Sequence, residues 1–241
     1  MRSILRVTGD DRVEFLQGLV TNDVSRAPVW AALLTAQGKY LADFFVVPQG
    51  DALLVDVDAR LADDLMRRLT MYRLRAKVGV EDAGLQVSRG VGVAPEGAVA
   101  DPRHPDMGWR LYGDAGGDDG TDWDAVRVAH TIPETLVELV PNETFILEAG
   151  FERLHGVDFR KGCYVGQEVT ARMKHKTELR KGLIAVAVDG AAPPGTPVLM
   201  ADGREAGTLY TQSGGRAIAY LRFDRMDGPL TAGDARISAA G

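Results

Sequence analysis

The sequence predicts an α+β fold: an elaborated ferredoxin-like antiparallel sheet with helices, a second α+β lobe and a small C-terminal β-barrel. Three observations predict it. Short apolar runs and two amphipathic segments fill the first part of the chain. The apolar periodicity of helices and strands is weaker in the middle. Near the C-terminus, turn residues recur between short apolar runs. We therefore expect three domains, at residues 1–82, 83–180 and 181–241.

The chain begins with a predicted strand and helix. Residues 3–8 alternate between apolar and polar side chains, as a strand does. Asp11 and Glu14 have the spacing of a capping box, and the apolar residues after them repeat at helical intervals. We expect a helix from about residue 11 to residue 20.

Three further apolar runs are separated by short turns and predict an antiparallel meander. The runs lie at residues 31–35, 40–47 and 52–57. Asp58 then caps a second predicted helix, whose leucines share one face, and a strand near 76–80 ends the lobe. Two helices on one antiparallel sheet are the elements of a ferredoxin-like lobe.

The middle of the chain gives weaker signals. Val91–Val93 predicts a short strand, and the Gly/Asp-rich residues 114–122 predict a solvated, mobile loop. Residues 123–130 predict a short helix, and residues 140–156 a further helical segment. After residue 180, Gly/Asp and Pro/Gly turns separate short apolar runs, which predicts a barrel of about six strands.

Composition limits the function classes. The chain has 241 residues, a formal net charge of −6 and one cysteine, Cys163. The length is enough for a sizeable core, and no apolar run is long enough to span a bilayer. A lone cysteine excludes an intramolecular disulfide and a self-contained four-thiolate metal site. No leader is recognisable, so we expect a reducing compartment, most simply the bacterial cytoplasm.

The densest cluster of chemically capable residues is Lys161–Glu168, with the sequence KGCYVGQE. Cys163 lies there between two glycines and beside Lys161, which would favour a thiolate. The alternative is a buried structural thiol, because free cysteines are often buried. Spacing alone leaves both interpretations open.

The same region is basic. Residues 160–181 carry seven Lys or Arg and two Glu, so this window has a charge of +5 and the rest of the chain −11. Such asymmetry suits an anionic ligand: a polyglutamate tail, a phosphate or RNA. It also suits a solvated helix face. Tyr164 is the only aromatic residue of the window, so nucleic-acid binding is weakly supported.

Two carboxylates are further candidate site residues. Asp43 lies in a strongly apolar predicted strand and faces either a ligand or solvent. Glu143 follows a proline and either caps a helix or binds a ligand. The four histidines lack metal-binding spacings, so we expect no metal site, and nucleotide-binding glycine motifs are absent.

These motifs together resemble a known family. KGCYVGQE, followed by Thr170-Ala171-Arg172, is similar to the signature of YgfZ-type folate-binding proteins, within the superfamily of the glycine-cleavage T-protein, an aminomethyltransferase. Four other segments also resemble this family and extend the likeness over most of residues 1–185. They are Gly9–Asp11 with Phe15–Asp23, Gln37–Asp43, Tyr72–Val78 and Val140–Glu143.

The resemblance implies a three-part chain around a central channel that binds tetrahydrofolate or a derivative. Family members act in assembly or repair of iron–sulfur enzymes, so client iron–sulfur proteins or cluster-assembly factors are the implied partners. Cys163 and Asp43 are the implied catalytic residues, and Glu143 is the implied pterin-binding carboxylate. The other implied folate-binding residues are Arg127, Asn22, Tyr72, Lys161, Tyr164, Gln167 and Glu168.

Three functions follow for testing. The first is a tetrahydrofolate-binding accessory protein for iron–sulfur enzymes, in which Cys163 supplies a thiolate. The second is a folate-dependent one-carbon transferase or demethylase resembling the aminomethyltransferases, in which Asp43 orients or deprotonates the folate amine. The third is a non-enzymatic RNA-binding module that uses residues 160–181.

Overall fold

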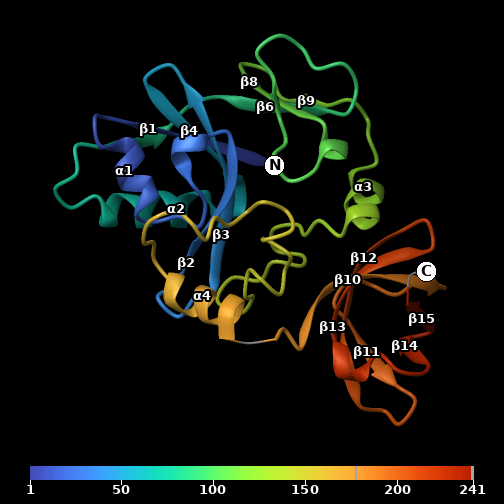
Figure 1. Ribbon diagram of the computed structural model, residues 1–241. Helices are drawn as coiled ribbons and strands as arrows, with labels where there is room; N and C mark the ends of the chain where they lie inside the picture. The colour runs from blue at the N-terminus through green and yellow to red at the C-terminus, as the bar shows by residue number, and fades with distance from the viewer. Residues whose placement is uncertain (177, 240–241) are drawn as a thin grey trace. The chain divides into compact units, whose positions relative to one another are not determined.

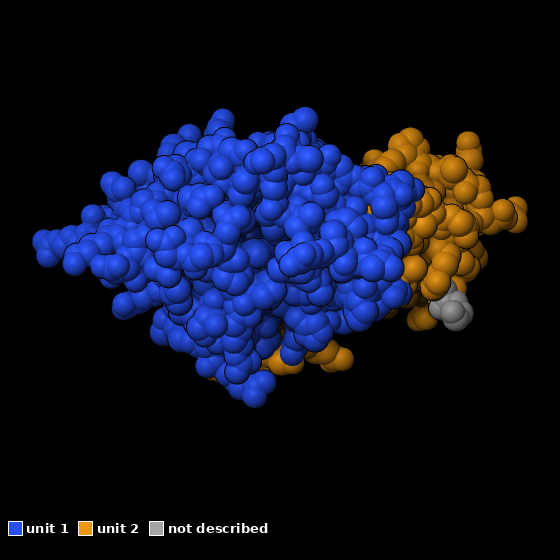
Figure 2. All heavy atoms as spheres, turned by 90° about the horizontal axis from the view of Figure 1, so that it is seen from above, with its two compact units in different colours: residues 1–121, 151–171 blue, residues 122–150, 172–241 orange. Residues whose placement is uncertain are grey.

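The computed structural model describes residues 1–176 and 178–239 (Figure 1). The described chain divides into two compact units, which Figure 2 shows in separate colours. Unit 1 comprises residues 1–121 and 151–171, and unit 2 comprises residues 122–150 and 172–241. These boundaries fall inside the predicted middle domain, so the three-domain division stays a prediction.

The larger sheet of unit 1 has the strand order β2-β3-β4-β1-β5 and is antiparallel throughout. The strands are β1 (Arg2–Thr8), β2 (Val29–Leu34), β3 (Tyr40–Gln49), β4 (Ala52–Asp58) and β5 (Gly79–Asp82). Every residue of β2 and β4 is buried, because side chains on both faces of these strands are covered. The predicted meander is therefore present as β2, β3 and β4.

Two helices belong to this sheet, α1 (Arg12–Gln17) and α2 (Ala59–Tyr72), with a short 3-10 turn at Val24–Arg26. Asp58 caps α2 as expected, by accepting a hydrogen bond from the Arg60 amide at 2.9 Å. The predicted capping box of α1 is wrong. The Asp11 carboxylate instead accepts from the Lys77 amide at 2.7 Å, and α1 ends near Gly18 rather than at residue 20.

A second, smaller sheet has the order β7-β8-β6-β9. Its strands are β6 (Gln86–Gly90), β7 (Val99–Ala100), β8 (Trp109–Gly113) and β9 (Gly117–Asp118), with a 3-10 turn at Pro105–Met107. The strand predicted at residues 91–93 is wrong, because pairing with β8 uses residues 86–90 and the next residues bend into solvent. The Gly/Asp-rich segment contributes β9, which pairs in parallel with β6.

A buried ion cluster joins the two sheets of unit 1. Asp56 on β4 accepts hydrogen bonds from Arg2 on β1 at 2.6 Å, from Arg110 on β8 at 2.6 Å and from the Tyr112 hydroxyl at 2.9 Å. Arg110 also lies over the Phe45 ring, 4.0 Å from its centroid. Burial acts to raise the pKa of Asp56, but Arg110 and Arg2 outweigh it and hold that pKa below its usual value.

The first part of unit 2 contains one helix, α3 (Trp123–His130), which confirms the helix predicted there. The helical segment predicted at 140–156 is wrong, since these residues form successive turns. Asn142 and Gly150 have positive φ angles of 66° and 80°, and Pro141 has no amide hydrogen to donate. These backbone features interrupt a helix although the apolar spacing suggests one.

The C-terminal part of unit 2 is a closed six-stranded barrel with the order β10-β13-β12-β11-β14-β15, as predicted. The strands are β10 (Lys181–Asp189), β11 (Thr196–Met200), β12 (Glu205–Ser213), β13 (Arg216–Arg222), β14 (Leu230–Ala232) and β15 (Ala235–Ala239). A 3-10 turn at Phe223–Arg225 follows β13, and helix α4 (Gln167–Lys176) precedes the barrel. Alternate residues such as Val186, Ala219 and Leu221 fill the interior.

Among the described residues, the helices are too short or too polar to cross a lipid bilayer.

Candidate functional site

The KGCYVGQE segment forms a loop that leads into α4, and Cys163 is exposed in it. This placement excludes a buried structural thiol. Lys161 is buried, and its amine donates hydrogen bonds to the carbonyl oxygens of Gln17, at 2.8 Å, and Val20. Burial lowers the pKa of Lys161 to about 8. The lysine thus anchors the loop to the end of α1.

The other end of the loop is held by backbone packing. Gly166 has a φ angle of +83°, and a Cβ added there would lie 2.5 Å from the Thr35 carbonyl oxygen and 3.1 Å from Gly38 Cα. A glycine is needed at this position because its backbone lies directly on the turn between β2 and β3. By contrast, a Cβ added at Gly162 meets nothing within 4 Å. Cys163 therefore lies on a short exposed stretch between two fixed points.

The remaining residues of the motif differ in their exposure. Tyr164 is buried with its ring centroid 5.2 Å from the Lys161 amine, and burial raises the pKa of its hydroxyl to about 12. Gln167 is partly buried at the start of α4, and Glu168 is exposed. Within unit 1, the motif thus presents Cys163 and Glu168 to solvent while Lys161 and Tyr164 support the loop.

Asp43 is buried on β3, which excludes the solvent-facing alternative. Its two carboxylate oxygens accept hydrogen bonds from the Trp30 indole at 2.9 Å and from the Tyr40 hydroxyl at 2.7 Å. Trp30 in turn stacks on Phe151, with centroids 4.0 Å apart. In this arrangement Asp43 orients two aromatic side chains of the unit 1 interior.

Asn22 and Tyr72 also contact protein groups of unit 1: backbone carbonyl groups for Asn22 and the apolar core for Tyr72. The Asn22 side-chain amide donates to the carbonyl oxygens of Trp30, at 2.7 Å, and His155, at 2.6 Å. Tyr72 ends α2 and packs, partly buried, against the apolar core. Asn22 and Asp43 therefore meet at the same tryptophan, whereas Tyr72 belongs to the core cluster.

Glu143 lies in unit 2 and lines a pocket of about 160 Å³. The pocket is lined by Glu138, Val140, Glu143, Thr144, Ala149, Lys181, Leu183, Tyr210 and Tyr220. Glu143 is exposed at the turn after Val140, and burial and the nearby carboxylates of Glu138 and Glu143 raise the pKa of Tyr210. We name this cavity the Glu143 pocket. It combines carboxylates, a cation and two phenol rings.

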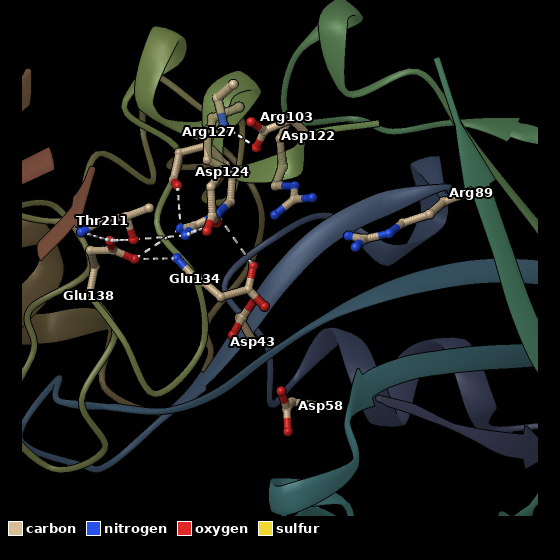
Figure 3. Close-up of polar contacts among 12 residues, drawn as sticks. Asp43, Asp58, Arg89, Arg103, Asp122, Asp124, Arg127, Glu134, Glu138 and Thr211 are labelled. Atoms are coloured by element: carbon tan, nitrogen blue, oxygen red, sulfur yellow. Dashed lines mark hydrogen bonds and ion pairs between the residues drawn. The ribbon is translucent and has the colours of Figure 1, made fainter. Parts of the chain in front are cut away.

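Arg127 is buried and is fully engaged by protein groups of unit 2 (Figure 3). Its partners are Asp124, Glu134, Glu138, Thr211 and the carbonyl oxygen of Ile132. The Glu138 and Asp124 contacts are both 3.0 Å, and the Thr211 hydroxyl on β12 lies at 2.8 Å. Since these contacts occupy the guanidinium, Arg127 positions Glu138 at the wall of the Glu143 pocket and fastens α3 to the barrel.

The sequence did not reveal the aromatic wall of this pocket. Tyr220 bridges it: its hydroxyl donates to Glu148 at 2.5 Å, and the Lys181 amine lies 5.2 Å from its ring centroid. Lys181 belongs to the basic window, whereas no motif or charge pattern of the sequence marks Tyr210, Tyr220 or Glu148. The alternation along β13 is the one signal that places Tyr220 on the outer face of the barrel.

The cations of the predicted basic window differ in their exposure and are divided between the two units. Lys161 is buried in its loop and donates to the carbonyl oxygens of Gln17 and Val20. In contrast, Arg172, Lys174 and Lys176 are exposed on α4, and Lys181 begins β10 of the barrel. Because Tyr164 is buried, the window lacks an exposed aromatic side chain on which a base could stack.

Comparison with known proteins places this geometry in a family. Residues 180–241 match the model of the CAF17 C-terminal beta-barrel domain. The chain is 33% identical to the human iron-sulfur cluster assembly factor IBA57, mitochondrial, over 95% of this chain and 78% of that protein. The mouse protein of the same name is 31% identical, with the same coverage. The chain belongs to the IBA57 family.

The IBA57 family extends to fungi, since the Phaeosphaeria nodorum homologue is 34% identical over 93% of this chain and 69% of its own length. The family assignment corrects the resemblance to YgfZ, because the relatives that show the family are IBA57 proteins. The expected cytoplasmic location is contradicted, because the mouse, human and fungal relatives are all named as mitochondrial proteins.

A solved structure confirms the fold class. The glycine cleavage system aminomethyltransferase T from Bartonella henselae superposes with a TM-score of 0.76, covering 99% of this chain and 83% of that chain at 12% identity. The IBA57-family chain thus has an aminomethyltransferase-like α+β fold with a C-terminal barrel.

Proposed function

We propose that this protein assists the assembly or repair of iron–sulfur proteins and that it binds a reduced folate in the Glu143 pocket. The observation that carries the first part is the similarity over 95% of the chain to proteins named as iron-sulfur cluster assembly factors. The implied partners are iron–sulfur clients or other assembly factors.

Cys163 supplies the chemistry of this proposal. Its thiol is exposed on a loop fixed at both ends, by Lys161 and by Gly166, so it can reach a partner without unfolding. A thiolate is the usual protein ligand of an iron–sulfur cluster. One cysteine cannot hold a cluster, so a partner or a second copy must supply the other ligands.

The residues of the Glu143 pocket suit a reduced folate. A carboxylate such as Glu143 can accept hydrogen bonds from the amino-pyrimidine edge of a pterin. The rings of Tyr210 and Tyr220 offer apolar faces to the flat bicycle, and Lys181 offers a cation for the glutamyl carboxylates. Folate binding would place these groups in contact with one ligand within unit 2.

Titration calorimetry with tetrahydrofolate tests the binding part. We expect binding by the wild-type protein and a loss of affinity of at least about tenfold in Glu143→Ala, as for removal of a charge-assisted hydrogen bond. Glu152→Ala is a matched control, because Glu152 is an exposed acid outside the pocket. Equal affinity for tetrahydrofolate in wild type and Glu143→Ala would contradict the proposal that folate binds in the Glu143 pocket.

A depletion experiment tests the assembly part. Cells that lack this protein should lose activity of iron–sulfur enzymes while cluster-free enzymes keep theirs. Restoration by the wild-type gene is the control, and unchanged iron–sulfur enzyme activity would contradict the proposal.

The two other functions have less support. Asp43 is buried and each of its oxygens already accepts a hydrogen bond, which does not favour a role as a base in one-carbon transfer. RNA binding through residues 160–181 lacks an exposed stacking platform, since Tyr164, the one aromatic residue of that window, is buried.

A further inference from the structure

A second pocket of unit 2 shares a wall with the Glu143 pocket. It has a volume of about 360 Å³, and we name it the basic pocket. It is lined by Lys181, Glu205, Ala206, Gly207, Thr208, Tyr220, Arg222 and Arg225. Lys181 and Tyr220 line both pockets, so the two cavities adjoin at these side chains.

Strand register explains why the pockets are continuous. Tyr220 on β13 pairs with Leu183 on β10 and with Thr208 on β12, and Arg222 pairs with Lys181. These residues alternate with the interior residues of their strands, so they lie on one outer face of the barrel. A rigid sheet surface therefore runs from one pocket to the other.

The two ends of this surface carry opposite charge. The Glu143 pocket has the carboxylates of Glu138 and Glu143, whereas the basic pocket has Lys181, Arg222 and Arg225 against one lining acid, Glu205. The Arg225 guanidinium donates to the Glu205 carbonyl oxygen, and Asp224 lies close enough that, after the larger effect of Arg222, the Arg225 charge helps to lower the pKa of Asp224.

The other two cations each have an acidic neighbour, and both cations are themselves partly exposed to water. Arg222 pairs with Asp224 at 3.0 Å, but the two side chains are 40% and 59% exposed. Lys181 is 43% exposed and lies 4.0 Å from Glu148, whose side chain is 9% exposed. An exposed pair such as Arg222–Asp224 is weak, about 0–1 kcal/mol, so an incoming anion can compete for Arg222, and the exposed Lys181 amine can contact the same anion.

We propose that the basic pocket is an anion subsite that holds the carboxylates of an extended ligand whose other end lies in the Glu143 pocket. This rests on the proposed function, because the ligand is then a folate whose pterin meets Glu143 and whose glutamyl tail meets Arg222 and Arg225. Tyr220 separates the two subsites and contacts the middle of the ligand. Since each added glutamate brings another carboxylate, the site selects polyglutamyl over monoglutamyl folates.

Titration calorimetry on the full chain with three probes tests this inference: 6-methyltetrahydropterin, tetrahydrofolate and its triglutamate. For the wild-type protein we expect affinity to rise along this series and the rise to shrink at high salt, because salt screens exposed charges. In Arg222→Ala/Arg225→Ala we expect the triglutamate to bind about tenfold more weakly, and the pterin within about twofold of wild type.

Arg216→Ala/Arg236→Ala is the matched control. It removes two exposed barrel cations that line neither pocket, and it should bind all three probes as wild type does. Thermal unfolding of both double variants checks that the barrel is intact.

The probes distinguish failure of the inference from failure of folate binding. Pterin binding that needs Glu143, with no preference for the triglutamate or no effect of the double variant, would overturn the anion subsite and leave the folate proposal standing. If the wild-type protein binds none of the probes, both proposals fail together.

Discussion

At the scale of single residues, the exposed thiol and the buried lysine of one motif have opposite roles. Cys163 is presented to solvent, whereas Lys161, two residues earlier, donates its hydrogen bonds inward to the end of α1. A substitution at Cys163 should therefore separate chemistry from folding, and a substitution at the supporting positions should not.

Cys163→Ala should leave the protein folded and abolish its function in cells. Because the side chain is exposed, we expect the melting temperature to change by less than about 2 °C. The measurement is complementation of a deletion strain, scored by iron–sulfur enzyme activity, with thermal unfolding of the purified variant alongside. Full complementation by the alanine variant would exclude a chemical role for the thiol.

Gly166→Ala should destabilise the protein, and Gly162→Ala should not. At Gly166 the φ angle is +83° and a Cβ would lie 2.5 Å from a backbone oxygen, whereas the space around Gly162 is open. We expect a loss of about 2 kcal/mol or more at Gly166 and within about 0.5 kcal/mol of wild type at Gly162. Urea denaturation of the two variants measures the difference, and equal stability would show that the loop does not depend on this contact.

At the scale of secondary-structure elements, α3 and the barrel are linked by a buried charge pair. Arg127 on α3 contacts Glu138 at 3.0 Å and Thr211 on β12 at 2.8 Å, and both charged side chains are buried. Removing one partner of such a pair leaves the other charge buried without compensation.

Arg127→Met should lower the free energy of unfolding of unit 2 by about 3–5 kcal/mol. Hydrogen exchange should report faster exchange of β12 amides, with little change in strands β1–β4 of unit 1. The double variant Arg127→Met/Glu138→Gln should recover part of the loss, because the stranded carboxylate is then neutral. No change in β12 exchange in Arg127→Met would mean that the pair does not stabilise the barrel.

At the scale of the whole molecule, stability should depend on pH through the cluster around Asp56. Its folded-state pKa lies below the ordinary value, so it contributes stability above about pH 4 that is lost as the pH falls through the folded-state pKa. Arg110→Met should therefore lower the melting temperature at neutral pH and move the acid unfolding midpoint to higher pH.

Circular dichroism across a pH series measures this effect. Arg89→Met is a suitable control, because its pair with Asp118 is partly exposed and 3.8 Å long. An acid midpoint in Arg110→Met equal to that of wild type would contradict a stabilising role for the cluster.

Much of the fold was predictable because local signals agreed with burial. Asp58 before an apolar helical stripe predicted α2, and the regular turns after residue 180 predicted the closed barrel. The helical segment predicted at residues 140–156 is wrong, because the sequence pattern does not show where the φ angle becomes positive, as it does at Asn142. The aromatic wall of the Glu143 pocket was not predictable, since strand register brings Tyr210 and Tyr220 together from separate strands.

The site residues show the same limit. Sequence could single out Cys163 by its glycine neighbours, and Glu143 by its motif, but it could not show which polar groups are already occupied. Arg127 and Asn22 are predicted to bind a ligand, and in the structure their donors contact protein groups, so a ligand role for them stays a prediction. Whether Glu143 binds folate stays a prediction.

Unit 1 is built from two separate stretches of the chain, residues 1–121 and 151–171. Trp30 stacks on Phe151, and Gly156 lies so close to the Trp30 ring that an added Cβ would be 2.7 Å from it. The residues that complete this core follow an excursion of the chain into unit 2 at 122–150. A nascent chain released from the ribosome before residue 171 therefore lacks part of its first core, and a protease cut at one loop cannot liberate either unit as an uninterrupted fragment.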